Sequence, residues 1–416
     1  MSSTTPRFAM TRRSLAALFL SASVTAGCSD SDDGPKGSNA AGDAWYVVST
    51  GVSVGDEFVG YLASVPSLDA ETNLDLDNAI EIEPSWIFSK QGQPYVYAAS
   101  LLSPTIIRYS VSDEGKMVPD KTVSFANFGL QSAYLAAGAP IYSDEKSYFV
   151  DDLQDQIVIW NPKRMETIGT IPLDDGMDGK LPPAAEGTIV IHDGLILTVI
   201  YWLDPNDDPS LYGSHVRLIA IDPKTDEIVS STDDTRLTHA APLGHATDGS
   251  LFYSPGSFIS AEAVVGEGHG SPSRLLRVGP QESTFDADFD LDLSALVGGR
   301  PAGDYTLLND DTALIRAWHG DLADTITDEN WKDVLWSQAG FMWWRWHVGD
   351  AEAVQIPNQT PAALGSSVFS LDGKTYVLRT SADSASTTLD EIDDQGGFRP
   401  ALTGPGQFIG NVIRVR

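Results

Sequence analysis

A strand–turn–strand unit recurs along this chain and restricts its fold more than any other feature of the sequence. In each copy a short apolar strand leads through a tight turn rich in Asp, Gly and Asn into a second apolar strand. Such turns suit the positive φ angles that hairpins require. Helical periodicity is scarce. The copies cover residues 85–97, 138–150, 187–199, 244–253, 303–315 and 365–378, and all but the first begin at or directly after a glycine.

A third strand and a further turn follow each hairpin, and a more polar fourth strand comes next. The spacing of the copies varies between about forty and seventy residues, which is typical of four-stranded propeller blades with insertions of unequal length. The sequence therefore predicts an all-β chain folded as a β-propeller. The third strands are expected within residues 106–116, 157–168, 216–228, 274–283, 342–354 and 388–397.

The two ends of the repeat region complement each other. Residues 45–50 and 58–65 have the pattern of a second and a third strand without a first, and residues 408–416 that of a first strand without successors. Joined, they make a seventh blade closed by both termini, which removes exposed sheet edges. We expect seven blades, with six or eight as alternatives. An array of immunoglobulin-like sandwiches is the competing architecture, but it would not need the orphan C-terminal strand.

The N-terminal segment is typical of an exported lipoprotein. Arg12 and Arg13 precede an apolar run too short to cross a bilayer as a helix, so residues 1–27 are predicted to be a signal peptide. VTAG before Cys28 resembles a bacterial lipobox, which implies that Cys28, the only cysteine, carries lipid. A plain signal peptide is the alternative. TRRSLA also resembles a twin-arginine signal.

Residues 28–43 are polar and rich in Gly and Ser, which predicts a flexible acidic tether before a propeller domain at 44–416. Ser29 in place of Asp resembles a signal for the outer rather than the inner membrane. The formal net charge of −32 makes nucleic acid and anionic membrane surfaces poor partners. Solubility outside the cell accounts for most of this acidity.

Residues 285–293, FDADFDLDL, alternate Asp with apolar residues. This pattern predicts a fourth, outer strand with one packed side and one row of carboxylates that discourages edge-to-edge pairing. A calcium site is the alternative reading. It is disfavoured because the loop glycine and terminal glutamate of an EF-hand are absent.

Long insertions all fall between second and third strands, at residues 201–214, 254–273 and 318–340. In a propeller these loops share one face, here called the loop face, with the segments that lead into first strands. Insertions in repeat proteins tend to gather on the binding face. Thr327 and the acids that follow it predict a short helix over 327–336 as a partial lid.

The third strand within FMWWRWHVGD holds an unusual concentration of aromatic residues. Strand alternation sends Trp344 and Trp346 to one side, and Trp343 and Arg345 to the other. We predict that Trp344 and Trp346 are core residues between blades. Trp343 and Arg345 are candidates for ligand contact through stacking and cation–π interaction.

Candidate ligand-binding residues are the aromatic, Arg and His side chains that the predicted strand ends bring to the loop face. Such a set suits a flat, anionic or aromatic ligand, although an ordinary hydrated funnel is the alternative for each residue. No nucleophile elbow, HExxH helix or Cys/His pair occurs, so no catalytic residue, metal site or cofactor is predicted. The candidates are Trp86, Tyr134, Tyr201, Trp202, His245, Arg300, Arg316, Trp318, His319, Trp343, Arg345 and Arg379, with His239 as a further residue near the axis.

The lipobox, the acidic tether, IDPKTDEIV at 221–229 and DGKTYVLR at 372–379 together resemble the MxcI-like lipoproteins that accompany siderophore clusters. The resemblance implies a non-enzymatic envelope propeller that binds a ferric siderophore and passes it to a TonB-dependent outer-membrane receptor. Iron would be present only within the ligand. Two other function classes stay open: a propeller enzyme of the lactonase or quinoprotein type, and a protein-interaction scaffold.

Overall fold

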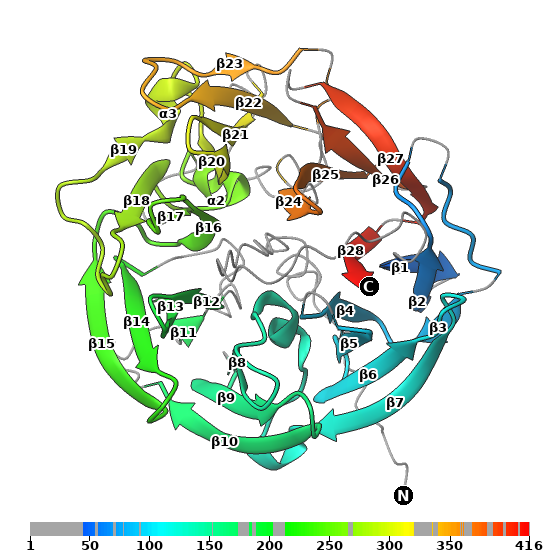
Figure 1. Cartoon of the computed structure of the whole chain (residues 1–416). Coiled ribbons are helices and arrows are strands. Elements are labelled where there is room, and N and C mark those ends of the chain that lie inside the picture. Colours follow the sequence, from blue (N-terminus) through cyan, green and yellow to red (C-terminus); the bar gives the residue numbers. More distant parts are fainter. Residues whose placement is uncertain are drawn as a thin grey trace, which may run out of the picture.

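Seven small antiparallel sheets stand in a ring and form a seven-bladed β-propeller (Figure 1). The prediction of an all-β propeller with seven blades is confirmed. No helix among the described residues combines the length and apolar character needed to cross a membrane. The computed structural model describes residues 45–415 except 55–56, 70–71, 78, 91–92, 152, 174–182, 185–188, 203–212, 265–268, 320–334, 336–339, 358, 360, 362–367, 381–385, 394–396 and 407.

The blades are numbered in chain order. Blade 1 contains β4 (Ser85–Phe88), β5 (Tyr95–Ser100), β6 (Thr105–Val111) and β7 (Met117–Ser124). Blade 2 contains β8 (Ser147–Asp151), β9 (Gln156–Asn161) and β10 (Glu166–Pro172). Blade 3 contains β12 (Ile189–His192), β13 (Leu195–Trp202), β14 (Val216–Asp222) and β15 (Glu227–Asp234), with β11 (Pro183–Ala184) paired to β13.

Blade 4 contains β16 (Ala241–His245), β17 (Leu251–Ser254), β18 (Arg274–Val278) and β19 (Leu291–Asp292). Blade 5 contains β20 (Ala302–Asn309), β21 (Thr312–Trp318), β22 (Phe341–His347) and β23 (Val354–Gln355). Blade 6 contains β24 (Val368–Leu371), β25 (Lys374–Thr380), β26 (Ser386–Ile392) and β27 (Phe398–Pro405). The helical segments are η1 (Ala126–Phe128), η2 (Tyr134–Gly138), α2 (Ser257–Glu262) and α3 (Leu293–Leu296).

Blade 7 joins the two ends of the described chain. Its strand order is β28 (Phe408–Val415), β1 (Trp45–Val54), β2 (Glu57–Val65) and β3 (Ile80–Ile82). β28 pairs antiparallel with β1, from Trp45 opposite Val415 to Gly51 opposite Phe408. The predicted closure, with a first strand from the C-terminal end, is confirmed.

The ends of the blades define two faces. Second strands run into third strands at the loop face, and the turns between first and second strands form the opposite, hairpin face. Tyr201 and Trp202 end β13, and Trp318 ends β21, so the insertions that follow leave from the loop face as predicted. The predicted lid helix over 327–336 lies outside the described residues, apart from Leu335.

The core lies between neighbouring blades. Trp346 is buried with Tyr305 between blades 4 and 5, and Trp344 packs against the same apolar cluster. Trp343 instead packs with Val368 and Val377 of blade 6. The alternation predicted for this strand, and the core position of Trp344 and Trp346, are therefore confirmed.

Blade 2 departs from the prediction of a regular hairpin over residues 138–150. Its sheet has three strands, because η2 and an extended segment without ladder pairing replace the expected first strand. Pro140 lies in this segment and has no N–H to donate to a ladder. The turn itself persists, since Ser143 N donates to the Lys146 carbonyl oxygen at 2.8 Å.

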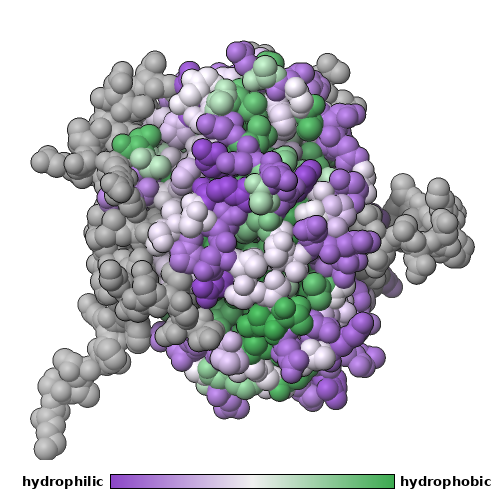
Figure 2. Space-filling view, turned by 90° about the vertical axis from the view of Figure 1, so that its left-hand side faces the viewer, coloured by the Kyte–Doolittle hydropathy of each residue, from purple (hydrophilic) through white to green (hydrophobic). Residues whose placement is uncertain are grey.

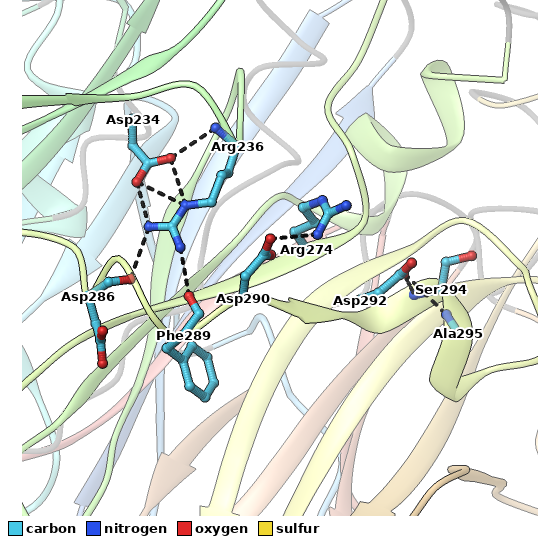
Figure 3. A network of polar contacts seen from close by, with 9 residues as sticks. All are labelled: Asp234, Arg236, Arg274, Asp286, Phe289, Asp290, Asp292, Ser294 and Ala295. Atoms are coloured by element: carbon cyan, nitrogen blue, oxygen red, sulfur yellow. Dashed lines mark hydrogen bonds and ion pairs between the residues drawn. The ribbon is translucent and has the colours of Figure 1, made fainter.

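The acidic segment 285–293 is also not the regular outer strand that we predicted. Only Leu291–Asp292 form a strand, and Asp292 then caps α3 by accepting from Ser294 N at 2.9 Å (Figure 3). Arg236 donates to the carbonyl oxygens of Asp286 and Phe289 at 3.1 and 2.8 Å and so clamps the loop (Figure 3). Asp286 and Asp290 therefore pair with arginines, and Asp292 accepts from the backbone. These carboxylates do not form a row along a regular strand.

The outer wall over blades 3 and 4 is mostly hydrophilic or neutral. Figure 2 shows this side with small, separate apolar groups among polar residues. Val229 on β15 is 54 % exposed, but single exposed apolar residues are ordinary on a folded surface. This wall therefore offers no extended apolar patch among the atoms that the structure describes.

Candidate functional site

The structure brings three of the predicted site residues together on the side of blade 5 that faces blade 6. In the β21–β22 register Arg316 lies opposite Trp343, and Trp318 lies opposite Phe341. Side chains at these positions share one side of the sheet. Trp343 contacts the apolar cluster of blade 6, so the whole group lines the loop-face end of the blade 5–blade 6 interface.

Arg316 occupies the centre of this group. Its guanidinium carbon lies 4.5 Å from the centroid of the Phe341 ring and 5.9 Å from that of Trp343. Asp304 forms an ion pair with it at 3.6 Å between Nη1 and Oδ2. Arg316 is only 2 % exposed. Burial lowers its pKa, and Asp304 offsets part of this effect.

Asp304 holds an uncommon backbone conformation, with φ at 49°, at a bulge in the β20–β21 ladder. Bulges and left-handed non-glycine residues concentrate near functional sites. The carboxylate accepts hydrogen bonds from Ser257 N at 3.1 Å and from Ser257 Oγ at 2.5 Å. Asp304 thus ties α2, an insertion of blade 4, to the buried arginine of blade 5.

Close backbone packing supports this connection. A Cβ atom at Gly303 would lie 2.2 Å from the carbonyl oxygen of Pro255, so only glycine lets the start of α2 approach β20. Figure 1 shows α2 on the inner side of the ring beside β20. Neither α2 nor the role of Asp304 was predicted from the sequence. The Gly–Asp pair that opens β20 was the only local signal.

Arg379, the fourth predicted residue at this interface, lies on blade 6. It pairs with Asp390, which is fully buried, and its guanidinium carbon lies 5.4 Å from the Phe398 ring centroid. Burial raises the pKa of Asp390, whereas Arg379 acts in the opposite direction. Both arginines of the interface therefore already have carboxylate partners within the protein.

Aromatic pairs occupy the loop-face ends of other blades. The rings of Trp86 and Tyr134 meet edge to face at 6.1 Å, and those of Tyr201 and His239 lie 4.5 Å apart. Trp86 and Tyr201 are buried, while Tyr134 is half-buried. Trp202 is fully buried, 5.4 Å from the guanidinium carbon of Arg217. These predicted residues are therefore at the expected face but mostly beneath its surface.

Three predicted residues are more accessible. His319 is exposed, and its backbone N–H donates to the Gly340 carbonyl oxygen at 2.5 Å. Arg345 is half-buried and lies opposite Leu314, away from the loop-face end of β22. Arg300 is half-buried, with its guanidinium carbon 5.9 Å from the Trp344 ring centroid.

The predicted position of His245 is wrong. β16 begins at Ala241 and runs to His245, so this histidine lies at the hairpin-face end of its strand. The strand starts earlier than the glycine-based repeat suggested. Burial, and to a smaller extent His192, lower the pKa of His245 to about 4.

Three indole N–H groups at the loop face have no acceptor among the described residues. They belong to Trp202, Trp318 and Trp343, and all three nitrogens are buried. Buried indole N–H groups ordinarily find a partner. The described residues include no cluster of three or more His, Cys, Asp or Glu side chains that could hold a metal ion. The loop-face ends of the blades therefore contain buried aromatic rings whose indole donors have no acceptor among the described residues.

No model of a known protein family matches the chain, and no curated protein does so either. A protein from Lactobacillus plantarum is similar in structure, with a TM-score of 0.52 and 10% identity over 90% of this chain and 99% of that one. A candidate 6-phosphogluconolactonase from Bacteroides fragilis gives a TM-score of 0.48 and 11% identity, covering 87% and 97%. The likeness to the Lactobacillus plantarum protein concerns the fold alone. The ring of seven sheets itself defines the chain as a seven-bladed β-propeller.

Proposed function

We propose that this chain is an exported, lipid-anchored propeller that binds a ferric siderophore at its loop face and passes it to a TonB-dependent outer-membrane receptor. The observation that carries the proposal is the group at the blade 5–blade 6 interface. There the N–H donors of Trp318 and Trp343 lack acceptors among the described residues and lie beside Arg316 and Phe341. Catecholate and carboxylate oxygens are suitable acceptors for such donors.

The charge pattern indicates how such a ligand would bind. The chain has a net charge of −32, so long-range electrostatics oppose the approach of an anionic complex. Arg316 and Arg379 are internally paired, so aromatic contact and short-range hydrogen bonds must supply the affinity. Each hydrogen bond contributes roughly 0.5–1.5 kcal/mol, and each aromatic contact a similar amount. Several of each support a micromolar dissociation constant after the cost of association.

The test uses the soluble domain, residues 44–416, and a panel of catecholate, hydroxamate and citrate-type ferric siderophores. We expect one class to quench tryptophan fluorescence and raise the melting temperature. Trp318→Phe keeps a ring but removes the N–H, so it should weaken binding several-fold. Trp160→Phe, within the core of blades 1 and 2, is the matched control. If no ferric siderophore changes fluorescence or melting, the siderophore proposal fails.

A protein-docking role is the second candidate, and one observation favours it. Leu102 and Leu153 are 51 % and 57 % exposed, in the second-to-third-strand loops of adjacent blades 1 and 2. Exposed apolar side chains on one face suit contact with a receptor. Leu102→Glu combined with Leu153→Glu should reduce cross-linking to a purified receptor while ligand binding stays intact. Unchanged cross-linking would remove these leucines from any docking surface.

A further inference from the structure

Arg300 differs from ten other arginines of the described structure in its electrostatic partners. The chain has 58 acidic residues and 26 lysines and arginines, so a guanidinium group rarely lacks a carboxylate neighbour. Arg300 has none within ion-pair distance among the described residues, and its only side-chain interaction there is with the Trp344 ring. Ten other described arginines each form an ion pair: Arg108, Arg164, Arg217, Arg236, Arg274, Arg277, Arg316, Arg379, Arg399 and Arg414.

The carboxylates near Arg300 in the sequence are engaged elsewhere, and the nearest of them, Asp304, pairs with Arg316. Asp290 pairs with Arg274 at 2.7 Å (Figure 3). Asp292 accepts from the backbone N–H groups of Ser294 and Ala295 at 2.9 and 3.2 Å. The positive charge of Arg300 therefore stays uncompensated by its own segment.

The backbone before Arg300 is open. Gly298 and Gly299 have φ values of 74° and 82°, both are exposed, and a Cβ atom at either would meet nothing within 4 Å. Gly299 N donates to the Ser294 carbonyl oxygen at 2.9 Å. The N–H groups of Gly298 and Arg300 donate to no acceptor in the part of the chain that the structure describes. Two backbone donors and one guanidinium thus belong to three consecutive residues.

We propose that the loop Gly298–Arg300 binds an oxyanion, either the carboxylate or the phosphate group of a small molecule. The N–H groups of Gly298 and Arg300 flank the one that Gly299 donates to Ser294, and backbone donors without an acceptor suit an anion. A guanidinium donates two parallel hydrogen bonds to a carboxylate or a phosphate group. Trp344 holds the guanidinium by cation–π contact, which limits its freedom before binding. α3 has only four residues, so its C-terminal dipole opposes the anion little.

This oxyanion site is separate from the proposed siderophore site. Trp344 packs on the side of blade 5 that faces blade 4, whereas Arg316 and Trp343 belong to the side that faces blade 6. The loop itself carries the chain from blade 4 to blade 5 at the loop face. The inference therefore goes beyond the proposed function and stands whether or not iron is bound.

The test follows the arginine Nε–Hε signals by NMR in the domain 44–416, with inorganic phosphate and citrate as probes at constant ionic strength. The Arg300 signal is identified by its loss in Arg300→Lys. We expect it to shift saturably with at least one probe, while the signal of Arg274, which is already paired, stays constant. A response to citrate alone assigns a carboxylate site, and a response to phosphate alone a phosphate site.

Calorimetric titration of variants completes the test. Arg300→Ala should weaken binding of the responding anion at least tenfold, and Arg300→Lys several-fold, because lysine cannot form the bidentate contact. Arg274→Ala is the matched control and should leave the affinity unchanged. The proposal is overturned if neither anion shifts the Arg300 signal saturably, or if the Arg274 signal moves in parallel as a general salt effect.

Discussion

Trp45 Nε1 donates a hydrogen bond of 3.0 Å to the carbonyl oxygen of Asp113, which joins blade 7 to the turn between β6 and β7 of blade 1. On the opposite side of blade 7, Tyr46 donates to Asp372 of blade 6 at 2.7 Å. Arg414 on β28 pairs with the same carboxylate at 2.7 Å. The closing blade is therefore fixed to both neighbours by side chains as well as by the pairing of β1 with β28.

Gly115 tests the contact between blade 7 and blade 1. Its φ is 76°, and a Cβ atom there would lie 2.5 Å from the Trp45 ring. Gly373 has nearly the same φ, 74°, but nothing within 4 Å of its Cβ position. Both alanine variants carry backbone strain, and only Gly115→Ala adds a clash. We expect Gly115→Ala to unfold at a lower denaturant concentration than Gly373→Ala. Its free energy of unfolding should be smaller by about 1–3 kcal/mol. Equal midpoints would show that Trp45 is not held against the turn.

Removal of residues 407–416 tests closure itself. The truncation deletes β28, the innermost strand of blade 7, and exposes the apolar surface that Val412 and Val415 bury. Loss of a buried strand should cost several kcal/mol, a large share of the stability of an ordinary domain. Calorimetry should show a sharp drop in melting temperature. An unchanged melting temperature would mean that the strand contributes nothing to the ring.

The buried ion pair of Asp304 and Arg316 should be far more important for stability than an exposed pair. Asp304→Asn leaves a 2 % exposed guanidinium without its carboxylate, which should cost about 3–5 kcal/mol. Asp290→Asn removes the carboxylate of a pair whose side chains are 33 % and 39 % exposed, and should cost below about 1 kcal/mol. Denaturant unfolding at neutral pH measures both variants. Similar losses would contradict the burial of Arg316.

Because of His245, the free energy of unfolding should depend on pH in the acidic range. Its folded pKa is about 4, below the ordinary value of 6.5, so the unfolded chain binds more protons between these values. The contribution of His245 to the free energy of unfolding is therefore fully present above about pH 6.5, and it is lost as the pH falls toward 4. His245→Gln should lose less stability than the natural chain across this window, and exposed His347→Gln serves as the control. Parallel curves for all three proteins would exclude the effect.

Cys28 should be the site of lipid attachment. It is the only cysteine and follows VTAG, so Cys28→Ser should leave the precursor unprocessed or release the protein from membranes. Membrane fractionation with metabolic labelling by a radioactive fatty acid measures both effects. Continued labelling and normal processing of the variant would sink the lipoprotein prediction.

The blade count, the closure and the side to which each residue of 341–347 turns were accessible from the sequence. They depend on local signals: turn residues between apolar runs, and alternation along a strand. For this reason the core positions of Trp344 and Trp346 could be predicted from one segment. The same reasoning wrongly predicted a first strand over the segment that contains Pro140 in blade 2. It also wrongly predicted a regular outer strand over 285–293, where the carboxylates bind arginines and backbone N–H groups instead.

Only the tertiary structure decided which charges meet. The pairing of Asp304 with Arg316, and the contact of Arg300 with the Trp344 ring, depend on how inserted loops and neighbouring blades pack together. Burial of Trp318 likewise depends on Gly340, whose backbone lies close against the indole ring. Alternation along a strand determines which way a side chain turns, but its partner is set by the spatial juxtaposition of segments distant in sequence, which local periodicity does not encode.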